Sequence, residues 1–118
     1  MHEMAIVTSV VDKVVEYAQQ NDAAKVNRVT LVVGDIHDIV DALMESCFQH
    51  MARGTVAEGA SLELARIPFR AQCSECNLVY PADIRSKDTL VCPDCGSSNF
   101  RIFNGNEFMI RDIEIVKG

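Results

Sequence analysis

Hydrophobic residues recur at helical spacing in two segments of the chain. In residues 4–20 the spacing of three and four predicts a helix, although valine alone would favour a strand. The positions that carry this pattern are Val7, Val10, Val11, Val14, Val15 and Ala18. A second helix is predicted from Asp38, with Gly54 as its stop signal. Its apolar positions are Ile39, Leu43, Met44, Cys47, Phe48 and Met51.

Three other segments show the alternation of apolar and polar positions that is typical of strands. The first is RVTLVVG, which ends at Gly34 and predicts a strand of about six residues. The second is SLELARI, at residues 61–67. The third is EFMIRDIEIV near the end of the chain, where the apolar parity changes near Arg111 and indicates a bulge or bend.

A cysteine motif separates the last two of these strands. It consists of CSEC, fifteen further residues, and CPDC followed by Gly96. Two such turns bring four sulfur atoms to one point, and the spacing is typical of structural zinc sites with four protein ligands. The candidate ligands are Cys73, Cys76, Cys92 and Cys95. Free thiols or two disulfides are the alternative, while a redox role would need a thioredoxin-like context that the pattern lacks.

The order of elements predicts a mixed α/β, or α+β, fold with two helices on a small three-stranded sheet and an inserted zinc-ribbon module. We expect one domain to comprise residues 1–69, completed by the C-terminal strand at 107–118. The four-cysteine zinc-ribbon domain is expected at residues 70–106, where apolar residues are few. Metal binding should therefore supply most of the folding free energy of this module.

Charge and composition narrow the possible functions. The formal net charge of −6 gives no electrostatic footprint for nucleic acid, so protein or metal partners are expected. No apolar run approaches the roughly 20 residues that span a bilayer, and no signal peptide is apparent. We expect a soluble, cytoplasmic protein. No nucleophile–base arrangement or phosphate-binding loop can be identified, so we expect no enzyme activity.

The chain begins with MHEM, which places a histidine beside the chain end. The α-amine of Met1, the amide nitrogen of His2 and its imidazole could together chelate one ion, and the Glu3 amide nitrogen could be a fourth donor. Square-planar or tetragonal nitrogen donor sets are those that Ni(II) and Cu(II) prefer. The alternative is an ordinary terminal histidine without a ligand role, and spacing alone leaves both possibilities open.

Taken in order along the chain, several segments resemble the HypA/HybF family of hydrogenase maturation proteins. They are MHEMAIV, the strand-ending Gly34, GTVAEGASLEL at 54–64, the four-cysteine ribbon, and GNEFMIRDIEIV at the end. The resemblance implies that His2 binds nickel for transport and that Cys73, Cys76, Cys92 and Cys95 hold structural zinc. It also implies a hydrogenase large subunit and a partner GTPase as partners, with urease maturation proteins as further ones.

The sequence departs from the family pattern in two places. Residues 70–106 contain no histidine, whereas some family members have histidines there that approach the nickel site. The sequence therefore does not identify the fourth nickel ligand or any axial one. His37 is expected to be a solvated loop residue, with a partner contact or a supplementary ligand as the alternatives.

The expected function is that of a nickel metallochaperone that binds Ni(II) at its N-terminus and delivers it during maturation of nickel–iron hydrogenase. The alternative is a zinc-ribbon interaction or regulatory adaptor that transfers no nickel. We expect a monomer or a homodimer. Cys47 is expected in the core, because free cysteine is among the residues most often buried.

Overall fold

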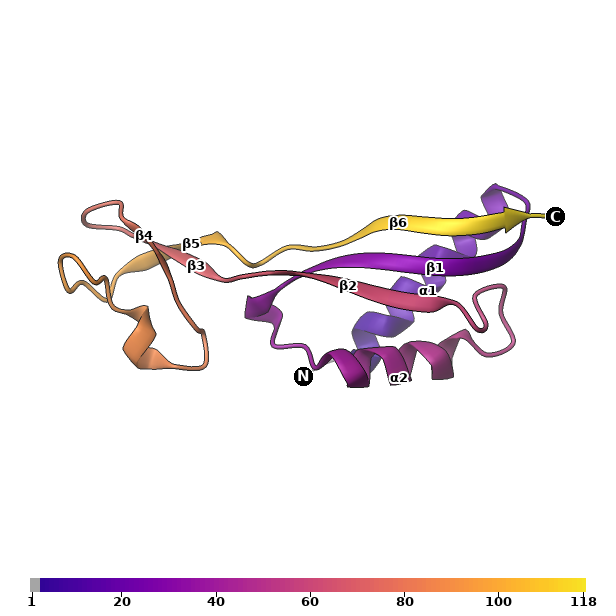
Figure 1. The fold of residues 1–118 in the computed structure, drawn as a ribbon, viewed down its shortest axis with the longest axis horizontal. Helices are drawn as coiled ribbons and strands as arrows, with labels where there is room; N and C mark the ends of the chain where they lie inside the picture. Colours follow the sequence, from indigo (N-terminus) through magenta and orange to yellow (C-terminus); the bar gives the residue numbers. More distant parts are fainter. Residues whose placement is uncertain (1–2) are drawn as a thin grey trace. The chain divides into compact units, whose positions relative to one another are not determined.

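The structure, a computed structural model, describes residues 3–118 (Figure 1). Its helices are α1 (Glu3–Gln20) and α2 (Asp41–Ala52). Its strands are β1 (Ala23–Gly34), β2 (Ser61–Ile67), β3 (Arg70–Cys73), β4 (Val79–Pro81), β5 (Phe100–Asn104) and β6 (Phe108–Lys117). Short 3-10 helices lie at η1 (Asp35–His37) and η2 (Lys87–Leu90). Within residues 3–118, no helix has both the length and the apolar character needed to cross a membrane.

The chain divides into two compact units. Unit 1 contains the chain up to Val32, residues Asp38–Ala65 and residues Met109–Gly118. Unit 2 contains Val33–His37 and Arg66–Phe108. Residues 33–37 thus group with the cysteine-bearing segment rather than with the helices. Whether residues 70–106 fold as a domain of their own stays a prediction.

A three-stranded sheet has the strand order β2-β1-β6. β1 and β2 run in the same direction and are connected through α2, as parallel neighbours require, whereas β6 runs in the opposite direction (Figure 1). The predicted class, two helices with small sheets in a mixed α+β fold, is confirmed.

The predicted apolar stripe of α1 forms much of the core of unit 1. Five of its six positions are buried, namely Val7, Val10, Val11, Val14 and Ala18. α1 packs against α2, whose buried residues are Met44, Cys47, Phe48 and Ala52. The expectation that Cys47 lies in the core is confirmed, since its exposed fraction is 8%.

The start of α2 differs from the prediction. The helix begins at Asp41 rather than Asp38, because Asp38 has a φ of +51° and Val40 is extended, so neither continues a right-handed helix. Leu43 therefore lies in the first turn, away from the buried stripe, and is 48% exposed. Its assignment to the apolar face was wrong.

Strand β1 is longer than the predicted six residues and begins at Ala23. Backbone pairing accounts for the extra length. The Val26 N–H donates to the Val56 carbonyl at 3.0 Å, and the Gly118 N–H donates to the Asp22 carbonyl at 3.1 Å. These partners are distant in sequence, so local propensity gives no sign of them.

Unit 2 contains an antiparallel sheet with the order β4-β3-β5. Its small core consists of Phe69, Ala71, Cys73, Tyr80 and Cys92. Two of these five residues are candidate metal ligands. So small an apolar core supports folding only with additional cross-links, such as a metal.

Two glycines of unit 2 permit a close backbone crossing. The Gly34 N–H donates to the Glu107 carbonyl at 2.7 Å, and the Ile36 N–H donates to the Gly105 carbonyl at 3.0 Å. A Cβ on Gly34 would lie 2.0 Å from the Gly105 carbonyl oxygen, which is not a possible contact. Gly105 has a φ of +101°, and a Cβ there would lie 2.5 Å from the Phe69 Cα. No side chain fits at either position without moving the backbone.

We therefore expect Gly34→Ala to lower the free energy of unfolding by at least about 2 kcal/mol, because backbone atoms cannot relax as a side chain can. The measurement is urea denaturation followed by circular dichroism. Gly54→Ala is the control, since Gly54 has a φ of +76° and open space around its Cβ position. Its left-handed conformation alone should cost only about 1 kcal/mol. Equal losses in the two variants would contradict the crossing as the cause.

Candidate metal centre

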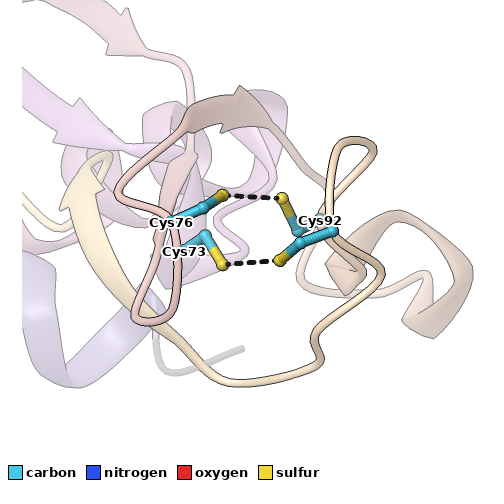
Figure 2. A group of neighbouring side chains, drawn as sticks. Cys73, Cys76 and Cys92 are labelled. Carbon is cyan, nitrogen blue, oxygen red and sulfur yellow. Dashed lines mark hydrogen bonds between the residues drawn. The ribbon is translucent and has the colours of Figure 1, made fainter.

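Four cysteine side chains of unit 2 converge on one point. Cys73 ends β3, Cys76 lies in the turn that follows, and Cys92 and Cys95 lie after η2. Their four sulfur atoms all lie within 4.8 Å of one another. The Cys73 and Cys95 sulfurs are 3.5 Å apart, and the Cys76 and Cys92 sulfurs are 3.6 Å apart. In Figure 2, the sulfurs of Cys73 and Cys76 lie on one side of a small gap and that of Cys92 on the other, and dashed lines across the gap mark these two contacts.

These distances match a tetrahedral zinc site and do not match disulfides. A disulfide bond is about 2.05 Å long, and all five cysteines have free thiols. Zinc–sulfur bonds of about 2.3 Å place the sulfurs of a regular tetrahedron about 3.8 Å apart. The cluster therefore suits structural zinc, with all four positions supplied by the protein.

Two turns of the same construction hold the cysteines. In the first, the Asn77 N–H donates to the Cys73 carbonyl at 3.0 Å, and in the second the Gly96 N–H donates to the Cys92 carbonyl at 2.9 Å. Asn77 has a φ of +65° and Gly96 of +75°, so each turn ends in the left-handed conformation that asparagine and glycine adopt most readily. A residue of this kind after each CxxC is the local reason that the paired sulfurs point the same way.

The turns also supply hydrogen bonds to the sulfurs. The backbone amide of Cys76 is the main cause that lowers the pKa of the Cys73 thiol to about 7. The Glu75 amide, which donates to the Cys73 sulfur at 3.4 Å, lowers this pKa further, whereas burial opposes both. For Cys76, the Leu78 amide lowers the pKa, but loss of solvent and the other three thiols outweigh it and raise the pKa to about 12. The cluster thus accepts negative charge at one sulfur and resists it at another. A divalent cation removes this conflict, because coordinated thiols lose their protons.

Sequence-predicted nickel ligand His2 lies outside the described residues, and its role stays a prediction. The neighbouring Glu3 lies within the described residues and is buried, although no pattern in the sequence predicts this. Its Oε2 accepts a hydrogen bond from the Val40 N–H at 3.1 Å, and this bond is the main cause that lowers the pKa of Glu3. The carboxylate therefore connects the first residue of α1 to the segment that precedes α2.

His37, expected to be a solvated loop residue, is half-buried in η1 and makes two contacts. Its Nε2 lies 2.9 Å from the Asn106 carbonyl oxygen, so this nitrogen donates a hydrogen bond. The ring also meets Phe108 edge-on, with centroids 5.9 Å apart. Both contacts lie within unit 2 and fix the orientation of the imidazole. They give His37 a structural role at the crossing of Gly34 and Gly105.

Comparison with known proteins agrees with this arrangement. A family model described as "Hydrogenase/urease nickel incorporation, metallochaperone, hypA" matches residues 1–115. Hydrogenase maturation factor HypA from Dehalococcoides mccartyi is 35% identical over 115 residues, which is 98% of this chain and 94% of that protein. The factor of the same name from Chlorobium limicola is 36% identical over 118 residues, covering 100% of this chain and 99% of the other.

Solved structures agree with the fold as well as with the sequence. The solution structure of the Ni metallochaperone HypA from Helicobacter pylori covers 100% of both chains with a TM-score of 0.66 and 26% identity. A second solution structure of a HypA protein covers 100% of this chain and 98% of the other, with a TM-score of 0.69 and 28% identity. The match over nearly the whole chain, together with the four-cysteine cluster, shows that this chain belongs to the HypA family of nickel-incorporating metallochaperones.

Proposed function

We propose that this chain binds Ni(II) at its N-terminus and delivers it during maturation of nickel–iron hydrogenase, without catalysing a reaction. The observation that carries the proposal is the family match from residue 1 to residue 115, which includes the terminal histidine. The relatives are hydrogenase maturation factors, and the family description names both hydrogenase and urease.

The proposed nickel donors are the α-amine of Met1, the amide nitrogen of His2 and the His2 imidazole. These nitrogens form fused small chelate rings, and such a donor set suits a square-planar Ni(II) ion. A site on a chain end needs no preformed cavity, so the ion can be passed on. The carboxylate of the next residue, Glu3, accepts a hydrogen bond from the Val40 amide and is not among the proposed donors.

The proposed zinc ligands are Cys73, Cys76, Cys92 and Cys95. Four thiolates around one zinc form a closed site with a net charge of about −2, and no position stays open for a substrate. The role of the metal is therefore to fold unit 2, whose buried cluster contains only three residues besides two of the cysteines. Zinc and nickel would then occupy sites of different chemistry, one of sulfur and one of nitrogen.

The proposed partners follow from the family. They are a hydrogenase large subunit as recipient, a GTPase that drives transfer, and urease maturation proteins as further partners. Transfer of this kind takes place in the cytoplasm, and the protein acts as a monomer or a homodimer. A zinc-ribbon adaptor without nickel transfer is distinguished by stoichiometry, since it would bind zinc and no additional labile nickel.

The zinc assignment predicts that Cys73→Ser loses zinc and that residues 70–106 then become sensitive to protease, because metal binding supplies most of their folding free energy. The helices of unit 1 should stay folded. The measurement combines metal content with limited proteolysis and mass spectrometry. Cys47→Ser is the matched control, because Cys47 is a free cysteine of the α2 core and should leave the zinc content unchanged. A metal-free Cys73→Ser protein with a protease-resistant insert would contradict the prediction.

The nickel assignment predicts that the position of His2 matters as much as its identity. An extension of about four residues before Met1 should weaken Ni(II) binding by more than about tenfold, because it moves the histidine beyond the third position, where the terminal amine, the backbone amides and the imidazole no longer fall in one set of fused chelate rings. His2→Ala should do comparable damage. Neither change should alter the zinc content. The measurement is calorimetric titration of Ni(II) into the zinc-loaded proteins.

His50→Ala is the control for loss of a histidine, since His50 is an exposed residue of α2. It should bind nickel like the unmodified protein. Unchanged affinity in the extended protein would exclude the amine chelate and leave a site made by side chains alone. Unchanged affinity in His2→Ala would refute nickel binding at this terminus.

A further inference from the structure

The hydroxyl group of Tyr80 lies buried beside the sulfur cluster. Tyr80 of β4 lies opposite Ala71 of β3, so the two side chains are on the same face of the sheet. Cys73 lies two residues after Ala71 on β3 and is therefore on that face as well. Cross-strand neighbours have Cβ atoms about 5 Å apart and diagonal neighbours about 7–8 Å, which a tyrosine ring spans. Ala71 is small enough for the ring to pass over it. Tyr80, Cys73 and Cys92 accordingly belong to one buried cluster.

This hydroxyl has no hydrogen-bond partner among residues 3–118, although Tyr80 is only 3% exposed. An unpaired buried hydroxyl costs about 1–3 kcal/mol, and phenylalanine would fill the same space without that cost. Buried tyrosines usually find a partner for the O–H group. The other buried members of its cluster are Phe69, Ala71, Cys73 and Cys92. Burial first, and then the negative charge of Cys92 and the other cysteines, raise the pKa of Tyr80, so the hydroxyl keeps its proton.

The sulfurs differ in the donors that they receive. The Glu75 N–H donates to the Cys73 sulfur at 3.4 Å, and the backbone amides of Cys76 and Ser97 act to lower the pKa of the Cys73 and Cys95 thiols respectively. Within the described part of the chain, no backbone N–H meets the Cys92 sulfur at hydrogen-bond geometry; this sulfur lies 3.6 Å from the Cys76 sulfur and within 4.8 Å of the other two. Cys92 is also 98% removed from solvent, with an exposed fraction of 2%, so water does not readily replace the missing donor. The sulfur that lacks a donor and the hydroxyl that lacks an acceptor share one core.

We propose that the Tyr80 hydroxyl donates a hydrogen bond to the Cys92 thiolate when the four cysteines hold zinc. Tyr80 is then a positioning residue of the metal site, and the inference rests on the zinc ligation proposed above. The hydrogen bond withdraws charge from the sulfur and satisfies the hydroxyl. Outer groups that hydrogen-bond to metal ligands typically change metal affinity by about 10–100-fold. The buried tyrosine would thus slow zinc loss from unit 2.

The test is Tyr80→Phe in the full chain, which removes one oxygen and keeps the ring. We expect zinc transfer to a chromogenic chelator to become at least about tenfold faster. With cobalt in place of zinc, the sulfur-to-metal charge-transfer band should move to lower energy, because a sulfur without the hydrogen bond gives up charge more easily. Tyr17→Phe, on the exposed side of α1, is the matched control and should change neither quantity.

The alternative, that the hydroxyl is merely an unpaired group, predicts the opposite sign. Removing it would then stabilise unit 2, and the variant would keep zinc as long as the unmodified protein or longer. That result, or an unmoved cobalt band, overturns the proposal. Failure of the zinc ligation itself is distinguishable, because the unmodified protein would then lack both a bound zinc and a cobalt–thiolate band. Circular dichroism of the zinc-loaded variant shows whether it has kept its fold.

Discussion

Four sulfur atoms within 4.8 Å of one another cannot all carry a negative charge unless a cation lies between them. In unit 2 this constraint makes the packing of the core depend on a bound cation. Two of the five buried residues of its core are cysteines of the cluster, and the turns that carry them repeat the same backbone hydrogen bonds. Without a cation, unit 2 would have three buried side chains, Phe69, Ala71 and Tyr80, and a few partly buried ones packed around thiols. With zinc as the proposed cross-link, metal binding and folding of this unit form one equilibrium.

The two proposed metal sites suit opposite tasks. A four-thiolate site is closed, so its zinc exchanges slowly and serves structure. A chelate of terminal nitrogens is open on its remaining positions and binds only after its donors lose protons, so its nickel can be handed to a recipient. Sulfur and nitrogen donors also separate the two ions by chemical preference. A carrier needs this separation, since a nickel ion that entered the sulfur site would not be delivered.

The sequence predicted those features that depend on local spacing. The period of three and four in residues 4–20 gave the buried stripe of α1, and the two CxxC pairs gave the convergence of four sulfurs that the structure contains. It missed features that depend on distant partners. The early start of β1 depends on backbone bonds to Val56 and from Gly118, and the burial of Glu3 depends on the Val40 amide 37 residues away. The sequence did not predict the position of Tyr80 beside the cysteines. The burial of its hydroxyl follows from the pairing of β3 with β4, which a single tyrosine in the sequence does not indicate.

The proposed division of labour places zinc in the sulfur cluster and nickel on nitrogen donors at the chain end. X-ray absorption at the zinc and nickel edges distinguishes the two sites in one sample of native protein with an unmodified N-terminus, loaded with one equivalent of each metal. We expect four sulfur neighbours at about 2.3 Å around zinc and only nitrogen or oxygen neighbours around nickel. Sulfur in the nickel shell, or nitrogen replacing sulfur in the zinc shell, would contradict it.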